Sequence, residues 1–115
     1  MLSSLETQYA EAAKTILQQR FREKITIYSI AEEIAVSEST LKRAFRNCYH
    51  LGIYEYQVQL RMEKAKELLQ AGDKSIKYIS RQVGYKRQGA FTKIFKKCVG
   101  MCPLEWAMRN REVVR

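Results

Sequence analysis

The 115-residue sequence contains one proline, one histidine and one tryptophan, and it has no long hydrophobic run. A single proline and scarce alternation of β-branched residues exclude all-β folds and Pro-rich disorder. No apolar stretch approaches the ~20 residues that a membrane-spanning helix needs. No signal-peptide pattern precedes the first periodic segment. We therefore expect a cytoplasmic protein that has no membrane among its partners.

Signatures of catalysis and metal binding are also missing. Cys48, Cys98 and Cys102 form no CxxC pair and have only His50 as a further soft ligand, which does not fit a closed zinc site. Cys48 and Cys98 each follow a phenylalanine by three residues on an apolar stripe, so we expect both to be small buried residues. No paired carboxylates, Ser–His–Asp set or phosphate-binding loop is present. The sequence predicts no enzyme and no cofactor.

Acidic residues are scarce in the last third of the chain. Residues 1–73 hold ten basic and ten acidic side chains, whereas residues 74–115 hold eleven basic side chains and only Glu105 and Glu112 as acids. The whole net charge of +9 therefore belongs to the C-terminal part. A concentrated positive field on a small domain attracts polyanions such as nucleic acid. Solubility alone is the simpler alternative.

Apolar residues recur at helical spacing through most of the chain, which predicts an all-α protein of about seven helices. The first helix covers residues 4–21, and short helices follow the N-caps Thr26 and Ser37. A longer helix runs from about residue 53 to residue 70 and ends before Gly72. Pro103 begins the last helix, with Trp106 as its core anchor. Along the first helix the residues expected to face inward are Leu2, Leu5, Tyr9, Ala12, Ala13, Ile16 and Leu17.

A unit of two short helices joined by a tight turn occurs twice. After the cap Ser75, the residues Ile76, Ile79, Ser80 and Val83 repeat Ile27, Ile30, Ala31 and Ile34 at an offset of 49. One extra residue then enters at the turn around residues 84–86, and the next apolar positions match at an offset of 50. Such a unit is a helix-turn-helix, whose second helix can enter a DNA major groove.

The outer faces of the two second helices carry basic and polar residues. Arginine and lysine can pair with guanine O6 and N7, glutamine with adenine N6 and N7, and hydroxyl groups with several edges. The residues expected to read bases are Ser39, Lys42, Arg43, Gln88, Thr92 and Lys93, with Arg43 and Lys93 foremost. Those expected to contact phosphates are Arg46, Lys86, Arg87, Lys96 and Lys97. A solvated helix face would have a similar composition.

The connecting helix suggests that both units bind one duplex. At ~1.5 Å per residue, a helix of roughly 17 residues is about 25 Å long. Successive major grooves on one face of DNA lie ~34 Å apart. We therefore expect a monomeric, asymmetric contact in two adjacent grooves, helped by DNA bending toward the protein.

The C-terminal half closely resembles the signature of the AraC/XylS family of bacterial transcriptional regulators. Its pattern reads Ser75-Ile76-x-x-Ile79-x-x-x-Val83-Gly84-Tyr85, then Phe91-x-x-x-Phe95-Lys96-x-x-x-Gly100-x-x-Pro103. The N-terminal half agrees through Ile30-Ala31, Ser37-x-x-x-Leu41-x-x-x-Phe45, Tyr56, Arg61, Ala65 and Leu68-Leu69. The resemblance covers roughly residues 8–109.

This resemblance implies one homeodomain-like domain over residues 1–115, with units at 8–52 and 72–110 and a bridging helix at 53–71. It implies binding of double-stranded promoter DNA and regulation of transcription, usually activation. In the parent protein it implies an effector-binding or dimerisation domain N-terminal to this one, which is absent here. The alternative is a helical module that contacts RNA polymerase or a partner regulator.

Several residues depart from the family pattern. His50 stands where glycine usually closes the third helix, and Gly52 stands where a serine or threonine usually caps the bridging helix. Arg87 replaces a common capping residue, and its charge opposes the helix dipole, so we expect it to face phosphate. Gly89 removes a side chain from a usual contact position. We expect Arg61 to brace the bridging helix against the first unit.

Overall fold

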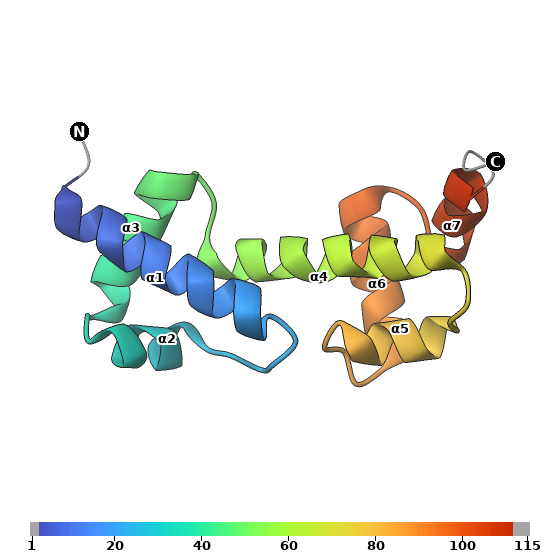
Figure 1. Cartoon of the computed structure of the whole chain (residues 1–115), viewed down its shortest axis with the longest axis horizontal. Helices are drawn as coiled ribbons and strands as arrows, with labels where there is room; N and C mark the ends of the chain where they lie inside the picture. The colour runs from blue at the N-terminus through green and yellow to red at the C-terminus, as the bar shows by residue number, and fades with distance from the viewer. Residues whose placement is uncertain (1–2, 112–115) are drawn as a thin grey trace. The chain divides into compact units, whose positions relative to one another are not determined.

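A computed structural model describes residues 3–111, which form seven α-helices and no strand (Figure 1). The helices are α1 (Ser4–Arg20), α2 (Ile27–Ile34), α3 (Glu38–Tyr49), α4 (Ile53–Ala71), α5 (Ile76–Gln82), α6 (Gln88–Val99) and α7 (Pro103–Arg111). The chain divides into two compact units, Met1–Leu60 and Arg61–Arg115, and the division falls within α4. The predicted all-α fold is confirmed. No helix within residues 3–111 is long and apolar enough to cross a membrane.

The first unit is built around Phe45 on α3. This ring is fully buried, and the rings of Tyr49 and Tyr56 lie 4.9 and 5.7 Å from it, centroid to centroid. α1 packs along α3 and α2, and it buries Leu17 against the same cluster. Ile30 of α2 is buried in the same cluster. Burial of a large apolar side chain contributes about 1.5–3 kcal/mol, so this cluster fixes where α3 lies on the unit.

The second unit has an equivalent core around Phe91 and Phe95 of α6. Both rings are fully buried and lie 5.7 Å apart. Trp106 of α7 meets Phe95 edge-on at 6.2 Å but is only half-buried, whereas its neighbour Ala107 is fully buried. Trp106 was expected to anchor α7 in the core, and it shares this role with Ala107.

Arg61, which we expected to brace α4 against the first unit, contacts the second unit. Its guanidinium lies 4.9 Å from the centre of the Tyr85 ring, in the turn of the second unit. A planar guanidinium stacks well on an aromatic face, which gives it a partner close to its own part of α4.

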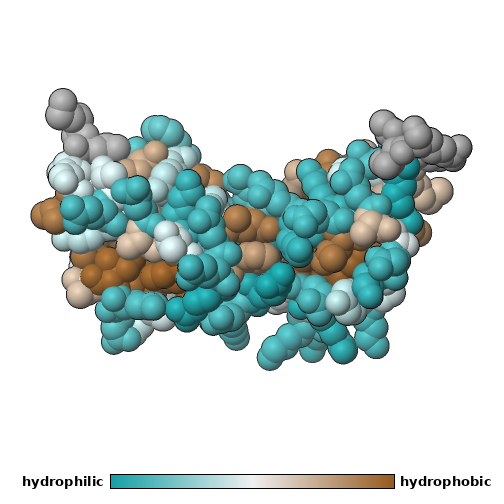
Figure 2. Space-filling model, viewed as in Figure 1, coloured by the Kyte–Doolittle hydropathy of each residue, from teal (hydrophilic) through white to brown (hydrophobic). Residues whose placement is uncertain are grey.

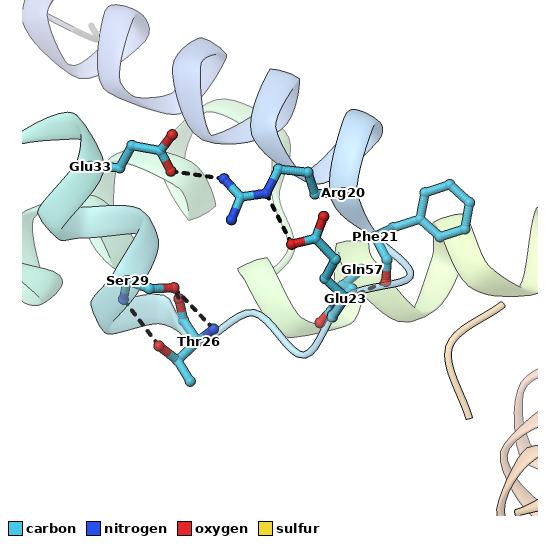
Figure 3. A network of polar contacts seen from close by, with 7 residues as sticks. All are labelled: Arg20, Phe21, Glu23, Thr26, Ser29, Glu33 and Gln57. Carbon is cyan, nitrogen blue, oxygen red and sulfur yellow. Dashed lines mark hydrogen bonds and ion pairs between the residues drawn. The ribbon is translucent and has the colours of Figure 1, made fainter. Parts of the chain in front are cut away.

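The loop after α1 is held by polar contacts (Figure 3). Gln57 of α4 is almost fully buried, and its amide nitrogen donates to the backbone oxygens of Phe21 and Glu23 at 3.0 and 3.1 Å. Arg20 pairs with Glu23 and, at 3.0 Å, with Glu33 of α2. A buried amide with two partners is costly to replace, so Gln57 fixes the loop that leads into the first helix-turn-helix.

Three predicted N-caps are confirmed. The hydroxyl groups of Thr26, Ser37 and Ser75 accept hydrogen bonds from backbone N–H groups three residues later, at 3.0 to 3.2 Å. Each cap satisfies one of the free N–H groups at a helix start. Arg87 is the N-cap residue of α6 and its side chain makes no capping hydrogen bond.

The same hydrogen-bonded turn closes the first helix of each helix-turn-helix. Ala35 has φ 69°, and the N–H of Val36 donates to the oxygen of Ala31 at 3.0 Å. Gly84 has φ 104°, and the N–H of Tyr85 donates to the oxygen of Ser80 at 2.9 Å. This bond spans six residues and is one of the two bonds of a Schellman motif. The extra residue of the second turn is Lys86, between Tyr85 and the N-cap.

Three predicted core positions are wrong. Leu5 and Ala12 are exposed, because the buried stripe of α1 is narrow and is formed by Ala10, Ala13 and Leu17. Cys98 is exposed in the last turn of α6, beyond the phenylalanines that fill the core, while Cys48 is half-buried. Leu2 lies outside the described residues.

At the start of α4, a side chain from the first turn of the helix accepts a hydrogen bond from the backbone N–H of the residue before the helix. The N–H of Gly52 donates to the Glu55 carboxylate at 2.7 Å, and Arg46 of α3 donates to the same oxygen at 3.0 Å. A Cβ on Gly52 would lie 2.9 Å from that oxygen and 3.0 Å from the arginine. Glycine therefore leaves space for the ion pair that replaces the expected serine or threonine cap.

Ala35→Gly should stabilise the protein by about 1 kcal/mol, because glycine adopts positive φ without the Cβ clash. Thermal or urea unfolding measures the change. Ala12→Gly is the matched control on an exposed helical site and should destabilise by about 1 kcal/mol. Equal effects at both positions would contradict strain at Ala35.

Glu55→Gln should make the stability of the protein less dependent on pH. The Gly52 N–H and then Arg46 hold the pKa of Glu55 below its usual value. A lowered folded-state pKa contributes stability above the unfolded value of about 4.3, and this contribution is lost as pH falls through the folded value. The variant should unfold more readily than wild type at pH 7, and the difference should shrink in acid.

Urea unfolding at pH 7 and below pH 4 tests this, with Glu67→Gln as the control on the same helix. Glu67 pairs with Lys64 at 3.3 Å on the surface. Exposed pairs of this kind contribute about 0–1 kcal/mol. A pH-independent loss in Glu55→Gln would contradict the carboxylate's role at the helix start.

Candidate nucleic-acid interface

α3 presents a continuous polar face opposite its buried one. Leu41, Ala44 and Phe45 are fully buried, so the helix cannot rotate without losing this contact. The predicted residues on its other side, Ser39, Lys42, Arg43 and Arg46, are all exposed. Lys42 and Arg43 follow Ser39 by three and four residues, and Arg46 follows them by four and three, which places all four on one helix face.

α6 presents the corresponding face in the second unit. Phe91 and Phe95 fix its orientation from the core side. The predicted residues Gln88, Lys93, Lys96 and Lys97 are exposed on the helix, Lys86 and Arg87 are exposed just before it, and Thr92 is half-buried. Gly89 has open space where a side chain would be, since a Cβ there would meet nothing within 4 Å.

Polar residues predominate on the face of the molecule shown in Figure 2. Figure 2 shows a mostly hydrophilic face, with hydrophobic residues reaching it in limited areas such as the one between α1 and α2. In the first unit, Ile16 and Ile27 are among the partly buried residues that pack against the core cluster. Within each unit, the exposed side of the second helix is therefore suited to a polar, charged ligand.

Both arginines of the α3 face have acidic partners from other helices of the same unit. The Nε atom of Arg43 lies 3.8 Å from a carboxylate oxygen of Glu6 on α1. Arg46 donates to Glu55 of α4 at 3.0 Å. The two arginine side chains are still 62% and 61% exposed, so both can reach a ligand.

The cations of the second unit differ from these. Among residues 3–111, no ion pair within 4 Å joins an acid to the predicted contact residues Lys86, Arg87, Lys93, Lys96 and Lys97. Their charge faces solvent without compensation from this part of the chain. The second unit thus carries the stronger positive field per helix face.

Sequence reasoning missed three residues of this surface. Asn47 is exposed one turn after Arg43 on α3, and helical spacing could have identified it. Glu55 follows Gly52 by three residues, the spacing of a capping box, which is a readable signal. Glu6 follows Ser3 at the same capping-box spacing, but its contact with Arg43 has no local signal, because it joins positions far apart in the chain. The described residues hold no cluster of three metal-ligating side chains.

Comparison with known proteins matches this architecture. A family model for a helix-turn-helix domain matches residues 30–109. The chain is 28% identical over 110 residues to the arabinose operon regulatory protein of Escherichia coli, covering 96% of this chain and 38% of that protein. The C-terminal domain of AraT, a response regulator from Geobacillus stearothermophilus, superposes with a TM-score of 0.87 at 30% identity, covering 94% of this chain and 89% of that one.

A third similarity concerns the fold. The DNA-binding domain of AdpA, a global transcriptional factor, was solved in complex with a target DNA, and it superposes with a TM-score of 0.81 at 21% identity, covering 92% of this chain and 95% of that one. The chain spans little more than a third of the length of the curated relatives that it matches. The chain belongs to the AraC/XylS family of DNA-binding transcriptional regulators, which is not a family of enzymes, and it contains that family's helix-turn-helix domain.

Proposed function

We propose that this domain binds a specific promoter sequence by inserting α3 and α6 into adjacent major grooves. The observation that carries the proposal is the repeated design of the two helices. Each is oriented by fully buried phenylalanine on one side and exposes basic and polar residues on the other. A major groove admits one α-helix, and a core-braced helix can present its side chains to base edges.

The exposed residues divide by their chemistry. Arg43 and Lys93 lie near the middle of their helices and are proposed to read guanine, with Ser39, Lys42, Gln88 and Thr92 as further readers. The remaining cations are proposed to contact phosphates; these are Arg46, Lys86, Arg87, Lys96 and Lys97. Phosphate contacts set the position of the helices, and base contacts set the sequence preference.

The wider role of the protein is proposed from its relatives. In a longer parent, an N-terminal domain would bind an effector or dimerise, and this domain would activate transcription at the promoter. The arabinose operon regulator, more than twice the length of this chain, supports a parent of that kind.

One observation favours the alternative of docking on RNA polymerase or a partner regulator. Leu104 and Met108 of α7 are more than half exposed and line a shallow hollow together with Cys102. Exposed apolar patches mark protein contacts. DNA binding and such a contact can coexist, and salt separates them, because an apolar contact responds weakly to ionic strength whereas phosphate contacts respond strongly.

The proposal is tested by selecting the sequences that the 115-residue chain binds from a random duplex library. We expect two short preferred blocks about one helical turn apart. With about six phosphates neutralised, log K should fall with log salt at a slope near −5. A single block would reduce one unit to a structural role, and a flat salt response would favour the protein-docking alternative.

Arg43→Ala and Lys93→Ala should each weaken binding to the selected duplex by about 1–3 kcal/mol and relax the preference at one base pair. Affinities for duplexes that vary one base pair at a time measure this. Arg46→Ala and Lys97→Ala are the controls on the same helices. These should weaken binding to all sequences alike and reduce the salt slope by about one. Uniform loss in the first pair would assign those residues to phosphates.

A further inference from the structure

The carboxylate of Glu6 joins the start of α1 to the exposed face of α3. One of its oxygens accepts from the N–H of Ser3 at 3.5 Å, in a capping box in which the Ser3 hydroxyl accepts from the N–H of Glu6. The other oxygen accepts from the amide of Asn47 at 3.4 Å and lies 3.8 Å from Nε of Arg43. The Glu6 side chain is only 22% exposed, so it is held in place rather than free in solvent.

The helices that carry these groups are packed closely. Ala10 and Ala13 of α1 and Ala44 of α3 are fully buried, and α1 lies along α3. A close-packed interior allows little shift between its elements. The carboxylate therefore stays at a fixed place beside Arg43.

The contact uses one edge of the guanidinium and leaves another free. Arginine has five N–H donors in a rigid planar fork, one on Nε and four on the two terminal nitrogens. With Nε facing Glu6, the terminal pair is free for two parallel hydrogen bonds to guanine O6 and N7. Arg43 is 62% exposed, so this end of the fork is accessible.

We propose that Glu6 is a positioning residue for base reading, which holds the Arg43 fork in the orientation that pairs with guanine. This inference rests on the proposed function, since it requires that Arg43 reads a base. A free arginine side chain loses rotamer entropy when it binds, and a partner that already restricts the side chain reduces that loss. Glu6 also places a negative charge beside the interface, which weakens attachment to DNA of any sequence.

Removal of the Glu6 charge should therefore have different effects on base discrimination and on binding to DNA of any sequence. In Glu6→Gln, discrimination at the base pair read by Arg43 should fall about three- to tenfold, while binding to a random duplex should be unchanged or tighter. Affinities for the selected duplex, for its single-pair variants and for a random duplex measure both. In an Arg43→Ala background, Glu6→Gln should no longer change discrimination.

Glu11→Gln is the matched control. It removes the same charge from the same helix, and among residues 3–111 no ion pair links Glu11 to Arg43. It should leave discrimination intact. Glu6→Asp keeps the charge at the helix start, where it favours folding, but shortens the reach toward Arg43. This variant should lose discrimination as Glu6→Gln does.

The outcomes separate this inference from the proposed function. If Arg43→Ala relaxes a base preference and neither Glu6 variant does, positioning by Glu6 is wrong and the DNA-reading proposal stands. If Glu6→Gln loses discrimination but Glu6→Asp keeps it in full, the effect of Glu6 comes from its charge, and positioning is also overturned. If Arg43→Ala changes no base preference, reading by Arg43 and its positioning by Glu6 both fail.

Discussion

The rest of each helix-turn-helix depends on one backbone hydrogen bond at the end of its first helix. The N–H of Val36 reaches the oxygen of Ala31, and that of Tyr85 reaches the oxygen of Ser80. The bond reverses the chain only because the residue before it has positive φ. The second helix then packs across the first helix. One side of the second helix is buried by this packing, and the other side is exposed.

The two units meet this constraint at different energetic cost. The first places Ala35 in the left-handed region, and the second places Gly84 there. An L-residue loses about 1–2 kcal/mol in that conformation, whereas glycine does not. The first unit offsets the cost by capping its second helix with the Ser37 hydroxyl, whereas Arg87, the N-cap residue of α6, makes no side-chain capping bond. Each turn thus has one favourable and one unfavourable feature. The first has Ala35 at positive φ but a capped second helix, and the second has Gly84 at positive φ but no side-chain cap on α6.

The sequence predicted what depends on neighbours along the chain and failed where distant helices meet. Helix positions, the caps and the tandem repeat follow from local chemistry and helical periodicity, and the structure confirms them. Cys98 was misplaced because periodicity does not show where a core ends. The contact of Arg61 with Tyr85 was not predicted, because it joins residues far apart in the sequence. The pairing of Glu6 with Arg43 crosses two helices and has no sequence signal.

Charge in the two units is arranged in different ways, although their backbones repeat. On α3 the exposed arginines pair with carboxylates from α1 and α4, which lowers the net positive charge of this face and, in the positioning that we propose, restrains Arg43. On α6 the lysines have no such partner within the described residues. Restrained donors favour discrimination between bases, because they lose less entropy when they bind. Unrestrained cations favour attachment to phosphate, which requires charge but little geometry. In the binding mode that we propose, the restrained Arg43 on α3 would therefore contribute more to selectivity, and the uncompensated cations of the second unit more to affinity.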